Sequence, residues 1–201
     1  SGREILTLQG HRGNINVVAF SPDGQLILTG EDRTVKLWDR NTGKEIYSLP
    51  KGISNNPLEK MYTIEKRFKP TAFSPDGKLI ITGGKGGTAT VWSRNTGRYI
   101  RTLEGHRGVI FAVTFSTDGK FILTGSSDGT VKLWDRHTGR EIFNLHGHND
   151  DIRAVGFSPD KRFILTGSED NTAKLWDIQT GEEIQTFRGH NYPITAVAFS
   201  P

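Results

Sequence analysis

Short runs of alternating apolar and polar residues cover most of the chain, and turn residues interrupt them every few positions. Between residues 105 and 146 the alternation predicts strands at Phe111–Phe115, Phe121–Thr124, Val131–Trp134 and Glu141–Leu145. Glycine supplies the positive φ that the intervening turns need, and Asp and Ser bond to their own backbone there. No stretch carries a helical period long enough to compete. The pattern therefore predicts an all-β fold built from short strands.

The strand pattern repeats along the chain. The four tryptophans are 54, 42 and 42 residues apart, at Trp38, Trp92, Trp134 and Trp176. A 42-residue period lies in the range of four-stranded propeller blades. The sequence therefore predicts one propeller segment over residues 1–201, with units at approximately 10–49, 50–104, 105–146 and 147–188 and a partial unit at 189–201.

The two ends of the chain fall inside units. The residues from Ser1 to Ile5 match those from Thr138 to Ile142, which predicts a leading outer strand, and the residues up to Pro201 predict a trailing inner strand. Four full four-stranded blades lie between them. We therefore expect part of a longer chain, or a partial ring that another copy completes by self-association.

Composition excludes several classes of chemistry. The chain has no cysteine, which excludes disulfides, thiolate metal sites and Cys nucleophiles. It shows no secretory signal pattern, and no apolar run approaches 18 residues, so we expect a cytoplasmic protein with no membrane partner. The formal net charge of +4 is a mild excess and does not indicate nucleic acid by itself.

Two recurrent motifs mark the units: a Gly-His pair before the first strand and a Trp-Asp pair at the end of the third. Gly105-His106 goes with Trp134-Asp135, Gly147-His148 with Trp176-Asp177 and Gly10-His11 with Trp38-Asp39, and Gly189-His190 opens the partial unit. In these residues the chain resembles the WD40-repeat β-propeller family over essentially its whole length. The resemblance extends to bacterial multidomain WD proteins, in which propellers accompany signalling effectors. It implies a non-catalytic scaffold or sensor that binds proteins or an effector domain of the same chain, with no cofactor.

The resemblance also implies a structural relay in which indole, Thr hydroxyl, His ring and Asp carboxylate bond in series. The relay positions are His11, Thr29, Asp32, Trp38, His106, Thr124, Asp128, Trp134, His148, Thr166, Asp170 and Trp176. A buried indole N–H and a buried hydroxyl each need a partner, which agrees with this role. An enzyme needs one site, whereas this set recurs, so we expect no catalytic residues. Unit 1 has a turn one residue shorter, and unit 2 keeps only Thr82 and Trp92.

The second unit also carries an insertion over residues 50–69 in place of its Gly-His pair. The insertion holds five cations and two carboxylates, with Tyr62, Ile64 and Phe68 among them. Two interpretations stay open: a solvated loop, or a basic recognition loop for an acidic protein surface. Nucleic acid is a less favoured ligand, because so small an excess of cations binds phosphates weakly.

The resemblance further implies that partners bind on the narrow face, through positions just after Gly-His and just before the turn aspartate. These candidate positions are Asn14, Asn16, Arg67, Lys69, Val109, Phe111, Asp151, Arg153, Glu31, Lys85, Ser127 and Glu169. They differ between units although the surrounding frame repeats. Phe111 is either a surface anchor or a core residue.

A metal or a propeller-type active site is not favoured. His146 and His148 face one side of a strand, but no third ligand stands at a matching interval. The inner strands carry small apolar residues such as Ala112-Val113-Thr114 rather than clustered carboxylates or histidines. We therefore predict no metal site and no enzyme.

Overall fold

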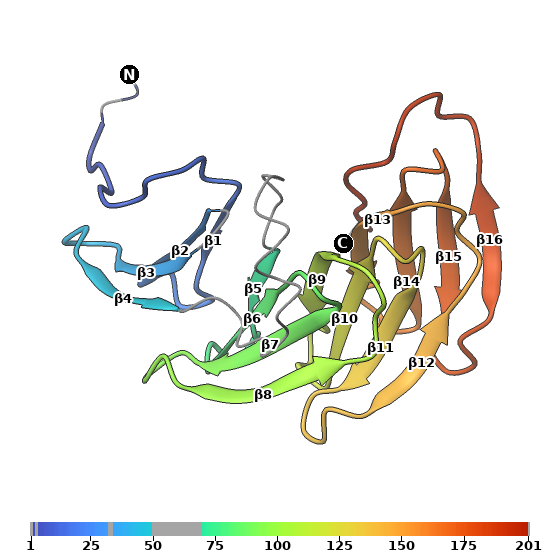
Figure 1. Ribbon diagram of the computed structural model, residues 1–201, viewed down its shortest axis with the longest axis horizontal. Coiled ribbons are helices and arrows are strands. Elements are labelled where there is room, and N and C mark those ends of the chain that lie inside the picture. The colour runs from blue at the N-terminus through green and yellow to red at the C-terminus, as the bar shows by residue number, and fades with distance from the viewer. Residues whose placement is uncertain (1, 3, 32–33, 50–69, 201) are drawn as a thin grey trace.

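The computed structural model describes residues 2, 4–31, 34–49 and 70–200. These residues form four antiparallel sheets of four strands each, and the strands of each sheet follow one another in chain order (Figure 1). We number the sheets as blades 1 to 4. The all-β, four-bladed arrangement predicted from the sequence is confirmed. None of the described residues lies in a helix, and so none of them forms a helix that could cross a membrane.

The strand bounds repeat closely from blade to blade. Blade 1 contains β1 (Val17–Phe20), β2 (Leu26–Gly30), β3 (Val35–Asp39) and β4 (Glu45–Leu49). Blade 2 contains β5 (Thr71–Phe73), β6 (Leu79–Gly83), β7 (Thr88–Ser93) and β8 (Tyr99–Glu104). Blade 3 contains β9 (Ile110–Phe115), β10 (Phe121–Ser126), β11 (Val131–Asp135) and β12 (Glu141–Leu145). Blade 4 contains β13 (Ile152–Phe157), β14 (Phe163–Ser168), β15 (Ala173–Asp177) and β16 (Glu183–Phe187).

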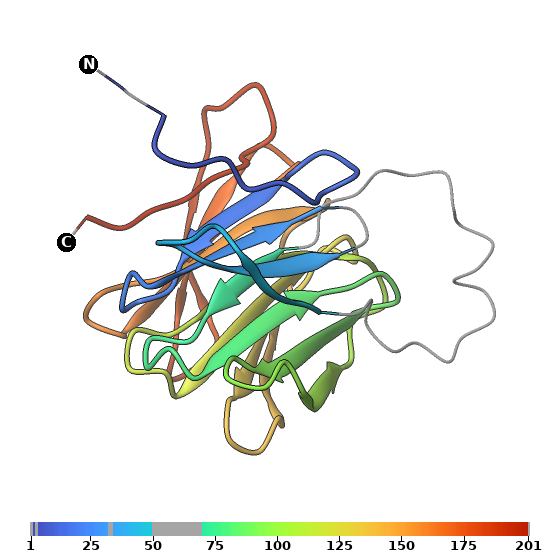
Figure 2. The same ribbon diagram turned by 90° about the vertical axis from the view of Figure 1, so that its left-hand side faces the viewer.

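The blades are arranged side by side with their first strands innermost and their fourth strands at the periphery (Figure 1). The inner strand β9 lies between β5 and β13, and β1 lies next to β5. Figure 2 views the molecule from the side of blade 1. This radial order places the loops that join successive blades at one end of the sheets and the turns between first and second strands at the other end.

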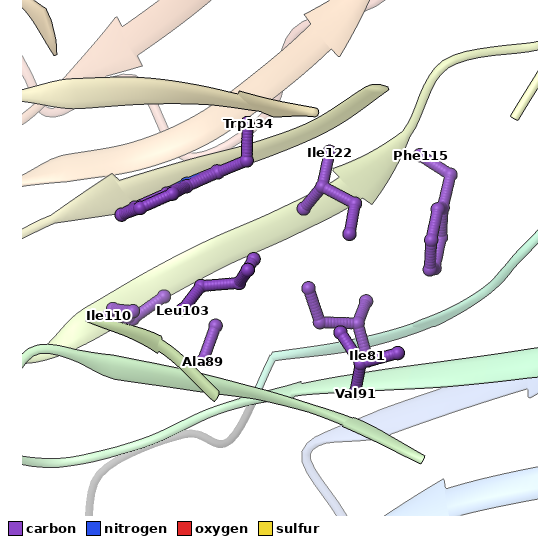
Figure 3. Packing of buried hydrophobic residues seen from close by; sticks show 8 residues of the cluster. All are labelled: Ile81, Ala89, Val91, Leu103, Ile110, Phe115, Ile122 and Trp134. Atoms are coloured by element: carbon purple, nitrogen blue, oxygen red, sulfur yellow. The ribbon is translucent and has the colours of Figure 1, made fainter. Parts of the chain in front are cut away.

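The hydrophobic core lies between blades rather than inside one of them. In one cluster, Ile81, Val91 and Leu103 of blade 2 pack against Ile122 and Trp134 of blade 3 (Figure 3). The same positions join blade 3 to blade 4 and blade 1 to blade 2. Each inner blade thus buries one face on the preceding blade and the other face on the next one, which is why alternate residues on both faces of its strands are apolar.

The two end segments are not strands, so the predicted leading outer strand and trailing inner strand were wrong in that respect. The trailing segment nevertheless packs as an inner strand does. Its Ile194 stands against Gly167 as Ile152 stands against Gly125, and its N–H donates to the Ser168 carbonyl at 3.0 Å. Within the described residues no second or third strand stands beside either segment to complete a ladder, and a strand needs such a partner.

Ion pairs between turns link neighbouring blades. Arg94 of blade 2 bonds to Asp23 of blade 1 at 2.8 Å, and Arg136 of blade 3 bonds to Asp76 of blade 2 at 2.6 Å. In blade 4 the corresponding residue is Ile178, and Lys161 lies 3.6 Å from Asp118 instead. Lys161 occupies a left-handed turn position, with φ of 64°, where the other blades have glycine.

Candidate functional site

The relay residues of blade 3 are brought together in one buried chain of hydrogen bonds. The Trp134 indole donates to the Thr124 hydroxyl at 2.9 Å, and that hydroxyl lies 2.8 Å from His106 Nε2. His106 Nδ1 lies 3.0 Å from an Asp128 oxygen. Because Thr124 accepts from the indole, its proton points to Nε2, so the ring carries its own proton on Nδ1 and donates it to the carboxylate.

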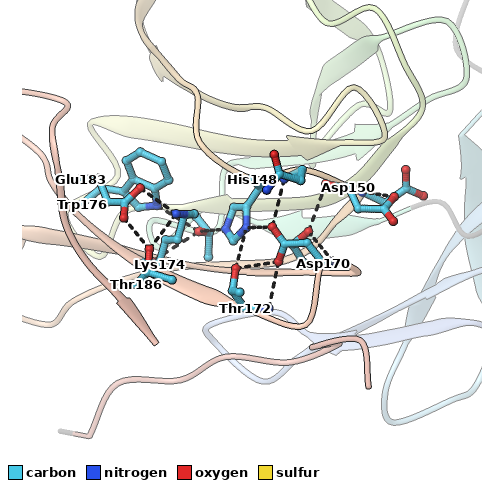
Figure 4. Close-up of polar contacts among 12 residues, drawn as sticks. His148, Asp150, Asp170, Thr172, Lys174, Trp176, Glu183 and Thr186 are labelled. Carbon is cyan, nitrogen blue, oxygen red and sulfur yellow. Dashed lines mark hydrogen bonds and ion pairs between the residues drawn. The ribbon is translucent and has the colours of Figure 1, made fainter. Parts of the chain in front are cut away.

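Blade 4 repeats this chain of bonds (Figure 4). Trp176 donates to Thr166 at 2.9 Å, Thr166 lies 2.8 Å from His148 Nε2, and His148 Nδ1 lies 2.8 Å from Asp170. The Thr172 hydroxyl donates to the same carboxylate at 2.6 Å. The equivalent threonines, Thr130 and Thr172, are members of the network that sequence reasoning missed, and their signal was the threonine two residues after each turn aspartate.

The environment of the relay fixes its charge state. Burial raises the pKa of Asp128, but hydrogen bonds from His106, Thr130 and the backbone outweigh burial and hold the pKa well below its ordinary value. The pKa of Asp170 is lowered against burial in the same way, by bonds from Thr172, the backbone and His148. Burial lowers the pKa of His148, which keeps this ring neutral near pH 7. Thr124 and Thr166 are both fully buried, at 0% exposure, so neither hydroxyl can reach a substrate.

In blade 1 a different acid faces the relay histidine, and the last bond of the relay is not formed, because His11 Nδ1 has no hydrogen-bond partner among the described residues. The Trp38 indole donates to Thr29 at 2.6 Å, and Thr29 lies 2.5 Å from His11 Nε2. The carboxylate that faces His11 Nδ1, at 3.4 Å, belongs to Glu31. The predicted relay residue Asp32 lies outside the described residues. Glu31 was predicted as a partner-binding residue, and the shortened turn of unit 1 was the signal that its acid is displaced by one position.

Blade 2 keeps only the first bond of the relay, from the Trp92 indole to Thr82 at 2.9 Å. Gly86 stands where blades 3 and 4 have aspartate. The next residue, Gly87, has φ of 73°, and a Cβ there would meet the His106 carbonyl oxygen at 1.9 Å. The turn of blade 2 thus forgoes a carboxylate and lets the backbone of blade 3 come close, which only glycine permits.

A Lys–Glu ion pair near the buried indole is also present in blades 1, 3 and 4 and absent from blade 2. Lys132 and Glu141 bond at 2.8 Å across β11 and β12 of blade 3, and blades 1 and 4 hold the same pair. In blade 2 the two positions are Thr90 and Tyr99, and the Tyr99 ring meets the Trp92 ring edge-on with centroids 6.4 Å apart. Blade 2 therefore surrounds its indole with fewer charged groups.

The relay carboxylates also hold the loop that follows each Gly-His pair. The Arg107 N–H donates to Asp128 at 2.7 Å, the Asn149 N–H to Asp170 at 3.0 Å, and the Arg12 N–H to Glu31 at 3.0 Å. Each bond joins a loop between blades to the turn between second and third strands. The buried relay carboxylates thus fix the backbone of the loops that carry the variable residues.

Four of the predicted partner-binding residues form one cluster across blades 3 and 4. The Arg153 guanidinium lies over the Phe111 ring, 3.8 Å from its centroid. The same guanidinium bonds to Glu169 at 2.7 Å and to Asp151 at 3.1 Å. Phe111 is 7% exposed, so it is a core residue covered by Arg153 rather than a surface anchor. We refer to these four residues as the Arg153 cluster.

The other candidate positions are dispersed. Ser127 accepts the Val109 N–H on its hydroxyl at 2.8 Å, which joins the two positions of blade 3. Asn14 is exposed on blade 1, whereas Asn16 and Lys85 are half-buried. Arg67 and Lys69 lie outside the described residues.

Three carboxylates gather at the edge of the Arg153 cluster, where Asp150, Asp151 and Glu169 each bring one oxygen within 4.8 Å of the others. Arg153 already forms ion pairs with two of them. With three carboxylates and one cation, Arg153, this surface carries a net negative charge and offers hydrogen-bonding groups of both kinds.

Four-stranded antiparallel sheets placed radially, with loops held by a buried relay, define a protein of the β-propeller repeat class. A family model described as "WD domain, G-beta repeat" matches residues 2–39, 71–93, 97–135, 139–177 and 181–201. The chain belongs to this WD40 family, and the resemblance found in its motifs is confirmed.

The relatives are WD-repeat proteins of several kinds. A guanine nucleotide-binding protein subunit beta from Oryza sativa subsp. indica is 37% identical over 95 residues, which is 46% of this chain and 23% of the relative. Protein HIR1 from Yarrowia lipolytica is 28% identical over 123 residues, 56% of this chain and 11% of the relative. An uncharacterized WD repeat-containing protein from Synechocystis is 34% identical over 87 residues, 42% of this chain and 22% of the relative. The chain thus spans at most about a quarter of the length of these relatives.

Proposed function

We propose that this chain is a non-catalytic scaffold segment that binds a protein partner on the loops held by the relay. Membership of the WD40 family and likeness to a guanine nucleotide-binding protein subunit support an interaction role. The observation that carries the proposal is the Arg153 cluster, in which candidate positions from two blades meet in one surface.

The chemistry of the Arg153 cluster favours a protein ligand. Arg153 is held between an aromatic ring and two carboxylates, so little side-chain entropy is lost when it is contacted. Arginine is enriched among residues that dominate binding energy at protein interfaces. The relay below the cluster fixes the backbone of blade 4 at Asn149, and preorganised loops bind with a smaller ordering cost.

Some finer parts of the proposal rest on the resemblance and the sequence. These are binding on the narrow face, a cytoplasmic location, a bacterial signalling context and an effector domain in the same chain. The alternative function, nucleic-acid binding through residues 50–69, concerns a segment outside the described residues, and no structural observation favours it.

The proposal is tested by affinity capture from a lysate of the source cells with matched charge variants. Proteins retained by the wild type are expected to be lost, by at least about tenfold, from Arg153→Glu and to persist on Arg140→Glu, a control at an exposed arginine of blade 3. Equal retention by both variants, after each is shown to be folded, would contradict the Arg153 cluster as the binding surface.

A further inference from the structure

The turn between the third and fourth strands forms an outer corner of each blade, and two of the four corners carry charges of both signs. In blade 1 the corner carries Asp39, Arg40 and the exposed Lys44, and in blade 3 it carries Asp135, Arg136 and the exposed Arg140. The aspartate closes the turn, since Asp135 accepts the Thr138 N–H at 2.7 Å. These two corners show what the repeat places here by default.

The corner of blade 2 has lost its carboxylates. Ser93 replaces the turn aspartate, and Tyr99 replaces the glutamate of the neighbouring blades. The cations remain: Arg98 is exposed, and Arg101 donates to the backbone carbonyl of His137. Tyr99 between them is 49% exposed. Glu104 ends the same strand roughly 20 Å from Arg98, at about 3.3 Å per residue. This corner is therefore basic and partly aromatic.

The corner of blade 4 is its opposite. Asp177 keeps its place in the turn, where it accepts the Gln179 N–H at 2.7 Å, and an exposed glutamate, Glu182, occupies the position of Arg98. Ile178 and Gln185 stand where blade 2 has Arg94 and Arg101. Thus, in this turn and along β16, the described residues carry acids and no cation.

The surroundings of the acidic corner leave its charge in place. Glu183 bonds to Lys174 at 2.8 Å and is neutralised by that pair, so Glu182 and Asp177 supply the excess. Arg188 follows the far end of β16, roughly 20 Å from Glu182 at about 3.3 Å per residue.

The adjacent turn of blade 4, between β13 and β14, holds two further cations that have partners of their own. Lys161 faces Asp118 of blade 3, and the charge of Arg162 is offset by Asp160 of the same turn, whose pKa it helps to lower. The acidic corner therefore keeps its excess of negative charge.

Both corners lie on edge strands with the same backbone form. β8 and β16 are each the last strand of their sheets, with one side unpaired within the sheet. Each has a register shift that leaves an isoleucine out of the pairing, Ile100 in β8 and Ile184 in β16, and these isoleucines are 40% and 49% exposed. The two corners thus offer similar apolar centres with opposite charges around them.

We propose that the blade 2 corner binds the blade 4 corner of a second copy of this chain. The argument is charge complementarity between two equivalent positions, Arg98 and Glu182, which immediately precede the matching edge strands β8 and β16. A pair of copies can form this contact twice around a twofold axis, or once per neighbour in a chain of copies. The contact is small, so it is weak and sensitive to salt.

Sedimentation equilibrium at low ionic strength tests this surface with single substitutions. The wild type is expected to self-associate, with a dissociation constant that rises at least about tenfold from about 50 to about 500 mM salt. Arg98→Glu and Glu182→Lys are each expected to weaken association by a similar factor. Arg140→Glu, at the equivalent position of blade 3, is expected to leave the dissociation constant unchanged.

Mixing the two disruptive variants supplies the decisive outcome. In an equimolar mixture, the acid introduced at position 98 of one variant faces the base introduced at position 182 of the other, and the second contact of the pair keeps the native Arg98 and Glu182. Heterodimers are therefore expected to form with near wild-type affinity. A wild type that stays monomeric at low salt, an Arg140→Glu variant weakened as much as Arg98→Glu, or a mixture that fails to associate would overturn the proposal. None of these outcomes bears on partner binding at the Arg153 cluster.

Discussion

Blades 2 and 3 form the same four strands and are both covered on two faces, yet their polar interiors differ. Blade 3 links Trp134, Thr124, His106 and Asp128 in one chain of bonds, whereas blade 2 stops at the Trp92–Thr82 bond. The hydrophobic clusters on either side of the two blades are equivalent. Interblade packing and one indole bond are therefore enough to form the strands, while the remainder of the relay holds the loop and adds to the stability of the blade.

The difference separates two roles within one repeat. Where the carboxylate is present, as at Asp128, it binds the backbone of the following loop and fixes it to the blade. Where glycine replaces it, at Gly86, the turn instead approaches the backbone of the next blade at the following residue, Gly87. A blade can thus lack the carboxylate that holds its loop and still form its four-stranded sheet.

The largest effect is expected at the close approach of blades 2 and 3. Gly87→Ala and Gly129→Ala both place alanine at positive φ, which costs about 1–2 kcal/mol. Only at Gly87 would the new Cβ meet a backbone oxygen, at 1.9 Å against 3.5 Å for Gly129. We expect about 2–5 kcal/mol of destabilisation for Gly87→Ala and about 1–2 for Gly129→Ala by urea unfolding. Equal losses would show that blade 2 is not closely packed on the His106 backbone.

The second effect concerns the hydroxyls beneath the indoles. Thr124→Val leaves the Trp134 N–H and His106 Nε2 without partners, whereas Thr82→Val leaves only the Trp92 N–H without one. Each buried orphan costs about 1–3 kcal/mol. The free energy of unfolding should fall by about 2–4 kcal/mol in the blade 3 variant and about 1–2 in the blade 2 variant. A larger loss of stability for Thr82→Val than for Thr124→Val would contradict the proposed difference between blades 2 and 3.

A smaller effect is expected from acid, at His148 of blade 4. Burial lowers the pKa of His148 below its unfolded value of about 6.5, so the unfolded chain takes up a proton first as pH falls. Stability from this group is complete above about pH 6.5 and declines below it. His148→Asn should show a shallower loss between about pH 7 and about pH 5 than the wild type, measured by urea unfolding at each pH. Identical slopes would rule out a contribution from His148.

The smallest effect is expected at the ion pair between blades 3 and 4, where Lys161 of blade 4 faces Asp118 of blade 3 in place of an arginine. Ile178→Arg restores the residue found in blades 2 and 3, but Lys161 then occupies the turn where those blades have glycine beneath the arginine. The double variant Ile178→Arg, Lys161→Gly should be more stable than the sum of the single variants implies. The coupling should be about 0.5–1 kcal/mol in a double-mutant cycle. Additive changes would mean that the two exchanges are independent.

Much of this architecture could be predicted because the same strand and motif pattern occurs in several units of the chain. The positions of Trp134 and Gly105-His106 recur at a fixed interval, and each recurrence supports the others. Glu31 was mistaken for a surface residue because the unit 1 turn lacks one residue, and a count along the chain cannot show which carboxylate then reaches His11. Phe111 was undecided because burial by Arg153 comes from another blade, 42 positions away. Contacts between side chains of different units cannot be predicted from the sequence of one repeat alone.

Native-state hydrogen exchange compares the two inner blades most directly. The account predicts that the amides of β6 and β7 in blade 2 and the Trp92 indole exchange faster than those of β10 and β11 in blade 3 and the Trp134 indole, because a shorter relay leaves the sheet easier to open. The Arg107 amide, held by Asp128, should be protected with blade 3. Blade 2 being protected as well as blade 3, or better, would contradict the claim that the relay adds stability beyond interblade packing.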